Sequence, residues 1–230
     1  MANDDSPGVE SALKLISRAS FGGAAGVLAQ VGVVVATAAL WRLLWTHPAG
    51  LFTYHPSFQS LAFLGFLEGV LLLQPQPPNL ASKKKGLQLH QVFQYSSLVL
   101  IFVGAGFIVY NKAIHGAKHI TTWHATFGVI TLSFIVLQIL FGALIVYTPF
   151  TRLLFRSGEQ QAKQLWKYHR MSGYLTLSFL VATPMLALAS DWVRMNTVPA
   201  ERWVVGLGLG AAGVGAAARI QTGKLGFKSR

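Results

Sequence analysis

Long apolar runs separated by short polar breaks dominate the chain from residue 22 onwards. Six runs can be marked, at residues 22–45, 54–73, 88–110, 120–147, 166–189 and 203–218. A helix of about 20 apolar residues crosses the roughly 30 Å hydrocarbon core of a bilayer. The pattern therefore predicts an all-α integral membrane protein with six transmembrane helices.

The segments outside these runs divide the chain into three expected parts. Residues 1–21 hold Asp4, Asp5 and Glu10 and no apolar core, so we expect a solvated cytosolic lead-in and not a cleaved signal peptide. Residues 22–218 are expected to form the six-span domain. Residues 219–230 are expected to form a basic cytosolic tail.

Composition supports one membrane domain and narrows the chemistry. The 230 residues are 53% hydrophobic and 11% charged. The net charge of +12 does not indicate nucleic-acid binding, because the basic residues fall in short groups between apolar runs. The chain has no cysteine, which excludes disulfides, thiolate chemistry and cysteine-ligated metal centres.

The distribution of the basic residues predicts the orientation. Six spans place both termini on one side of the membrane. If that side is the cytosol, only five of the 19 Lys and Arg residues fall on the other side, namely Arg42, Lys112, Lys118, Arg194 and Arg202. An excess of positive charge marks the cytosolic side. Both termini are therefore expected in the cytosol, in an endomembrane (ER, vesicle or vacuole) or the plasma membrane.

This orientation sorts four histidines into two layers. His55 and His124 begin runs that lead inwards, so they lie near the outer face, whereas His90 and His169 lie near the cytosolic face. Four residues after each histidine, on the same helix face, stands an amide or a glycine: Gln59, Gln94, Gly128 and Gly173. A glycine one turn from an imidazole leaves room for a flat ligand.

Two layers of two imidazoles favour haem over zinc. Zinc needs three or four ligands at one point, whereas a six-coordinate haem iron takes one axial imidazole from each of two facing helices. Spans two to five would then form a four-helix core for two b-type haems, with spans one and six peripheral. The alternative is a six-span carrier or scaffold whose histidines bind a metal or relay protons. Glu68 is the only carboxylate within a span. It is either a partner of the haem edge or an acid that polar neighbours satisfy.

Several motifs carry a resemblance to a known family. They are LFTYHPSFQSLAF at the second run, a histidine about 35 residues later after a basic loop, KHITTWHATFG at the fourth run and KYHRMSGY at the fifth. This pattern resembles the eukaryotic cytochrome b561 family, and most closely its short six-span D2-type members. The motifs cover about residues 50–190, and the six-span frame covers nearly the whole chain.

The resemblance implies a di-haem protein that passes single electrons across a membrane. It would act as an ascorbate-dependent transmembrane reductase, from cytosolic ascorbate or a similar donor to monodehydroascorbate or a ferric chelate on the far side. The axial ligands implied are His55 with His124 on the outer haem and His90 with His169 on the inner haem. No further catalytic residue is implied, and a second copy of the chain is a candidate partner.

Candidate substrate residues lie at both faces. The family's cytosolic basic cluster for ascorbate falls on Lys83, Lys84 and Lys85, which could equally anchor the topology. On the outer face, His119 precedes the fourth run and lies near the expected outer haem.

Overall fold

A computed structural model describes residues 12–147 and 159–225, and every regular element in these ranges is a helix. The α-helices are α1 (Ala12–Ser20), α2 (Gly23–Thr46), α3 (Tyr54–Leu72), α4 (Leu80–Ile114), α5 (Trp123–Val146), α7 (Glu159–Ala187), α8 (Asp191–Asn196) and α9 (Pro199–Ala218). Two short 3-10 helices are η1 (Gly50–Thr53) and η2 (Thr222–Leu225). The all-α class is confirmed for this part of the chain.

Within residues 12–147 and 159–225, three helices are long and apolar enough to cross a membrane by length and composition. They are α2, α4 and α5, of 24, 35 and 24 residues. Their outward-facing side chains include many large apolar residues, among them Val31, Val99 and Leu137, which are 55%, 62% and 61% exposed. Apolar surface of this extent is typical of a protein that lies in lipid. The structure is thus that of an integral membrane protein, and the count of six spans stays a prediction.

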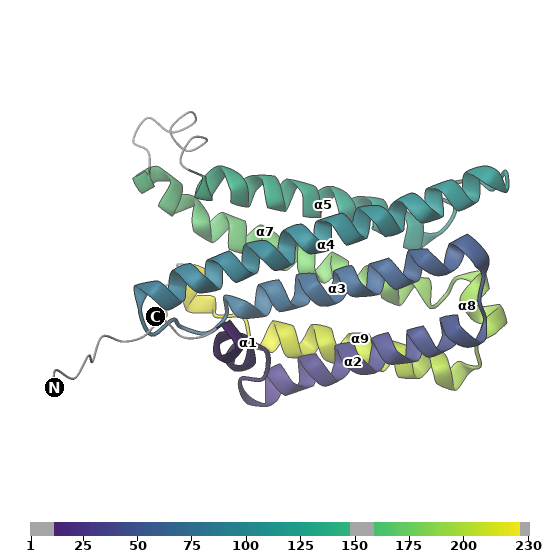
Figure 1. Ribbon diagram of the computed structural model, residues 1–230, viewed down its shortest axis with the longest axis horizontal. Helices are drawn as coiled ribbons and strands as arrows, with labels where there is room; N and C mark the ends of the chain where they lie inside the picture. Colours follow the sequence, from purple (N-terminus) through teal and green to yellow (C-terminus); the bar gives the residue numbers. More distant parts are fainter. Residues whose placement is uncertain (1–11, 148–158, 226–230) are drawn as a thin grey trace.

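The long helices pack as three pairs that run along the molecule (Figure 1). The pairs are α2 with α9, α3 with α4, and α5 with α7. Further contacts join α2 to α3, α4 to α5 and α7 to α9. Each pair therefore contacts both of the others, and in the view of Figure 1 the α3–α4 pair is drawn between them. The buried core follows the same arrangement, because Val33, Leu67, Leu71, Leu180 and Leu209 belong to one cluster.

Helix α4 begins earlier than the apolar run at residues 88–110 predicted. The chain from Pro75 to Gly86 reads as a break, yet α4 starts at Leu80. The Asn79 side chain accepts a hydrogen bond from the Ser82 backbone N–H at 2.8 Å, which caps the helix. The lysine triplet therefore lies in the first turns of α4 and not in a loop.

The lead-in is not solvated throughout, which corrects that expectation. Helix α1 occupies residues 12–20 and buries Leu15 and Ala19, which are 3% and 0% exposed. These two residues are four positions apart, so they share one helix face. That face packs against Leu72 near the end of α3.

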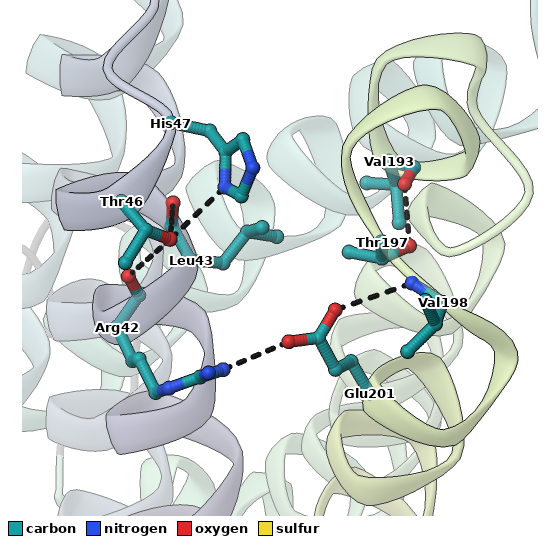
Figure 2. Close-up of polar contacts among 8 residues, drawn as sticks. All are labelled: Arg42, Leu43, Thr46, His47, Val193, Thr197, Val198 and Glu201. Atoms are coloured by element: carbon teal, nitrogen blue, oxygen red, sulfur yellow. Dashed lines mark hydrogen bonds and ion pairs between the residues drawn. The ribbon is translucent and has the colours of Figure 1, made fainter.

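Close backbone contact joins α2 to α9. A Cβ added at Gly32 would lie 2.5 Å from the Ala212 backbone nitrogen, and one added at Gly208 would lie 2.8 Å from the Gly32 carbonyl. Small residues let helix backbones approach in this way. At one end of the pair, Arg42 of α2 reaches Glu201 of α9 in an ion pair of 2.8 Å (Figure 2).

The described part of the expected basic tail contacts the ends of other helices. Arg219 donates to the Ala19 carbonyl at 2.9 Å, at the end of α1. Lys224 donates to the carbonyls of Leu73 and Gln74, each at 2.8 Å, at the end of α3. Both cations satisfy carbonyls that a helix end leaves unpaired. Residues 226–230 of the tail lie outside the described residues.

Candidate functional site: two pairs of histidines

The structure places the four predicted histidines on α3, α4, α5 and α7, one on each helix. His55 and His124 face each other between α3 and α5, with ring centres 6.1 Å apart and ring planes at 71°. Both are partly buried. The structure therefore brings together the two residues that the sequence assigned to the outer layer.

Backbone carbonyls orient both imidazoles of this outer pair. The Nδ1 atom of His55 lies 2.9 Å from the Gly104 carbonyl oxygen, and that of His124 lies 2.9 Å from the Thr183 carbonyl oxygen. A carbonyl can only accept, so each Nδ1 carries the proton and donates. The Nε2 lone pair of each ring is left available to bind a metal.

His90 and His169 line one cavity of about 720 Å³. The Nδ1 atom of His90 contacts the Gly69 carbonyl oxygen at 2.6 Å, in the same manner as the outer histidines. Apolar side chains of α5 and α7, including Ile135 and Leu177, form part of the wall. A volume of about 300–1,000 Å³ with mostly apolar walls and a few polar groups is typical of a cofactor site.

The α3–α4 pair repeats one set of contacts at its two ends. At each end, the Nδ1 atom of a histidine contacts a glycine carbonyl of the other helix. The glutamine four residues after the histidine donates to a second carbonyl of that helix, three residues before the glycine. The contacts are His55 with Gly104, Gln59 with Ile101 at 3.2 Å, His90 with Gly69, and Gln94 with Phe66 at 3.3 Å. The two glutamines of the predicted repeat thus join helices.

His169 has different neighbours from the other three histidines. Its Nδ1 atom lies 3.1 Å from the Gln138 amide nitrogen, and no backbone carbonyl contacts Nδ1 among the described residues. The rings of Phe141 and Trp166 approach it edge-on, with centres 5.7 and 6.2 Å away. Gln138 escaped the sequence analysis because it stands alone in an apolar run and meets His169 only across two helices.

The glycines near the histidines have separate roles. Among the described residues, a Cβ added at Gly128 would meet only Thr183, at 4.0 Å, so the space beside this glycine is open. A Cβ added at Gly173 would lie 2.8 Å from the Gln138 amide nitrogen, so Gly173 makes room for that side chain. A Cβ added at Gly142 would lie 2.9 Å from the His169 ring. Gly142, which the sequence analysis missed, allows the imidazole its position.

The outer histidine pair fits two axial ligands of one iron. Two imidazoles that bind opposite sides of a metal, each through a ring nitrogen about 2 Å away, have ring centres about 6 Å apart. The observed 6.1 Å between His55 and His124 agrees with this separation. Among the described residues, no group of three or more His, Asp or Glu side chains could hold a metal ion. The donor set therefore fits haem better than zinc.

Cationic side chains line the cavity that holds His90 and His169. Lys83 is the one member of the predicted triplet that lines it, whereas Lys84 and Lys85 do not. Arg170 and Lys224 also line it, and the Arg170 guanidinium donates to the Lys224 carbonyl at 2.7 Å. Burial, with a smaller contribution from the Arg170 charge, lowers the pKa of the Lys224 ammonium.

Two other candidate residues lie apart from this cavity. His119 is exposed between α4 and α5. Glu68 is 7% exposed and accepts hydrogen bonds from Ser20 at 2.5 Å and from Gln30. These contacts favour the interpretation of Glu68 as an acid satisfied by polar neighbours, and it does not line the cavity.

The chain is similar in sequence to known membrane proteins. A family model described as eukaryotic cytochrome b561 matches residues 54–194. The probable transmembrane reductase CYB561D1 of Mus musculus is 34% identical over 85 residues, which cover 36% of this chain and 37% of that protein. Transmembrane reductase CYB561D2 of Bos taurus and that of Homo sapiens are each 30% identical over 128 residues, covering 54% of this chain and 56% of the relative. The chain thus spans about half the length of these curated relatives, or less.

Proposed function

Because the chain belongs to the eukaryotic cytochrome b561 family, we propose that it transfers single electrons across a membrane as a transmembrane reductase. Membership of this family implies b-type haem, whose iron takes up and releases one electron at a time. We propose two such haems per chain. The relatives named as transmembrane reductases support the reaction class.

The facing imidazoles carry this proposal. His55 and His124 would hold the outer haem, and His90 and His169 would hold the inner one. Ring centres 6.1 Å apart support the outer pair, and a shared cavity of about 720 Å³ supports the inner pair. Protein ligands on both sides of the iron suit electron transfer and leave no position for a substrate to bind the metal.

The cationic lining of the inner cavity supports an anionic donor on that side. Ascorbate or a similar anion would be attracted by the positive charges of Lys83 and Arg170, an attraction that salt weakens. Lys84 and Lys85 would add long-range attraction only. The proposed acceptors, monodehydroascorbate or a ferric chelate, would bind at the opposite face, where His119 is exposed.

The proposal includes a topology. Six spans would place both termini in the cytosol, with α3, α4, α5 and α7 as the haem-holding core and α2 with α9 beside it. The pairing of α2 with α9 supports this division, because neither helix carries one of the four histidines. A homodimer in an endomembrane or in the plasma membrane is compatible with this arrangement.

The experiment that tests the function is a difference spectrum of the purified protein. We expect the reduced-minus-oxidised spectrum of six-coordinate b-type haem, with about two haems per chain by extraction. Reduction by ascorbate is then compared with reduction by dithionite, which tests the donor separately from the cofactor. A colourless protein would contradict electron transfer and favour the carrier or scaffold whose histidines bind a metal or relay protons.

A further inference from the structure

Three of the four proposed haem ligands have a backbone carbonyl beside the Nδ1 atom, whereas the fourth, His169, has a side-chain amide there. The Nδ1 atoms of His55, His90 and His124 each contact a backbone carbonyl, which is held by its helix and can only accept. The Nδ1 atom of His169 faces the side-chain amide of Gln138 at 3.1 Å. An amide has a donor end and an acceptor end, and half a turn about its last bond exchanges them.

In the orientation described, the donor end of the Gln138 amide faces the ring. Its Nε2 donates to the His169 carbonyl at 2.5 Å, and its Oε1 accepts from the Ser172 hydroxyl at 2.7 Å. An imidazole that binds iron through Nε2 carries its proton on Nδ1 and needs an acceptor there. In this orientation, Gln138 offers none.

Rotation of the amide supplies that acceptor without leaving a group unpaired. Oε1 then accepts from Nδ1 of His169, and Nε2 donates to the Ser172 hydroxyl. Ser172 can accept this bond because its hydroxyl proton then turns from Gln138 to the Tyr168 carbonyl, which lies 2.8 Å away. Rotation puts Oε1 in the place of Nε2, 2.5 Å from the His169 carbonyl oxygen, so a small shift of the amide toward the ring must accompany it to separate the two oxygens. Oxygen and nitrogen of an amide have nearly the same shape, so the cavity wall is unchanged.

On the basis of the proposed function, we infer that Gln138 is a positioning residue for His169, whose amide accepts the Nδ1 proton and thereby sets the reduction potential of the inner haem. A hydrogen bond from Nδ1 to an acceptor makes an axial imidazole more basic, which stabilises ferric iron and lowers the potential. Because Gln138 is a side chain, evolution or engineering can change this acceptor, whereas the three backbone carbonyls are the same for any sequence.

The test is a redox titration of each haem in full-length protein that carries Gln138→Leu or Gln138→Glu. Leucine removes the acceptor, so the inner haem should titrate at a higher potential than in the wild type. Glutamate is a stronger acceptor, so the inner haem should titrate at a lower potential. The outer haem should be unchanged in both. The low-spin ferric signal in electron paramagnetic resonance gives a second measure, because it responds to imidazole basicity at one haem.

Gln94 provides the matched control. Its amide lines the same cavity but donates to the Phe66 carbonyl at 3.3 Å and makes no imidazole contact among the described residues. Gln94→Leu should shift the inner potential less than Gln138→Leu does, and Gln94→Glu should lower it less than Gln138→Glu does. Equal shifts at the two positions would overturn the inference, because they would reflect cavity polarity alone.

If the Gln138 variants lose the inner haem, Ser172→Ala tests the role of Gln138 instead. Without its hydroxyl partner the amide is released, so the inner potential should rise, by less than in Gln138→Leu. An unchanged inner potential in Ser172→Ala would then overturn the inference. If the wild-type protein contains haem and all variants titrate like it, the inference is overturned and the proposed function is not. Wild-type protein without haem would overturn both the inference and the proposed function.

Discussion

Gly142 occupies a position where one added carbon would reach a proposed haem ligand. An alanine Cβ there would lie 2.9 Å from the His169 ring, so the ring or the helix must move. We expect Gly142→Ala to destabilise the fold by about 1–3 kcal/mol, the usual cost of overpacking. We also expect it to lower the content of the inner haem while the outer haem stays. Haem extraction and chemical unfolding in detergent measure the two effects.

Gly106 of α4 gives the control for this change. No atom of the described residues lies within 4 Å of a Cβ added there, so Gly106→Ala should keep both haems. Its stability should be unchanged or higher by about 0.5–1 kcal/mol, because alanine favours a helix over glycine. An equal loss of haem in both variants would contradict a steric role for Gly142.

The four histidines can be separated by substitution. His55→Ala and His124→Ala should each remove the outer haem, and His90→Ala and His169→Ala should each remove the inner one. The reason is that each iron would lose one of its two protein ligands. The measurement is a redox titration of each variant, followed by optical and electron paramagnetic resonance spectra, which distinguishes the two haems by potential. Loss of one haem by His55→Ala and of the other by His124→Ala would contradict the proposed pairing.

At the scale of elements, a buried carboxylate joins three helices. Glu68 of α3 accepts from Gln30 of α2 and from Ser20 at the end of α1. Glu68→Leu would leave both donors buried without a partner, so we expect a loss of about 1–3 kcal/mol in the free energy of unfolding. Glu68→Gln, which retains one acceptor, should lose less. Haem content and both potentials should be unchanged, and a shifted potential would instead support a role at the haem edge.

Helix α4 shows how local chemistry extends an element past its apolar run. The apolar pattern of this helix begins at residue 88, but the Asn79 cap and the helix-favouring residues after it start the helix at Leu80. As a consequence, Lys83, Lys84 and Lys85 point in different directions around the axis. Only Lys83 lines the cavity.

At the scale of the whole molecule, several segments contribute charged and polar side chains to the lining of the inner cavity. Lys83 comes from α4, Arg170 from α7 and Lys224 from η2, while Gln74 follows α3. The Gln74 amide oxygen accepts from the Tyr174 hydroxyl at 3.3 Å, which links α7 to the end of α3. The positive charge at this site is therefore a property of the assembled fold.

This geometry predicts unequal effects within the lysine triplet. Lys83→Gln should slow reduction by ascorbate several-fold, because it removes a charge that lines the cavity, whereas Lys84→Gln should have a small effect that salt abolishes. Reduction by dithionite should change little in either variant. Stopped-flow absorbance measures the rate for each variant with each reductant at two salt concentrations. Equal slowing by both variants, or with both reductants, would contradict a donor site at Lys83.

Much of the fold and the site could be predicted because membrane helices follow strong local rules. The six apolar runs each correspond to a helix in the described part of the chain, and the four histidines lie one on each of four helices. Helix α1 was missed because a nine-residue amphipathic helix is too short for the apolar pattern of a span. Arg170 was passed over because it stands beside His169, and its cavity position depends on how α7 meets η2.

The sequence alone determined the class of the protein, because hydrocarbon accepts only long apolar helices and makes an imidazole within them exceptional. It also predicted which histidines lie near each other, since the expected depth in a bilayer follows from position along a helix. Only the tertiary structure decided which atoms meet: the Nδ1 partners of each ring, the place of Gln138, and the divergence of Lys83 from its neighbours. Such contacts depend on rotation and register between helices, which no local pattern encodes.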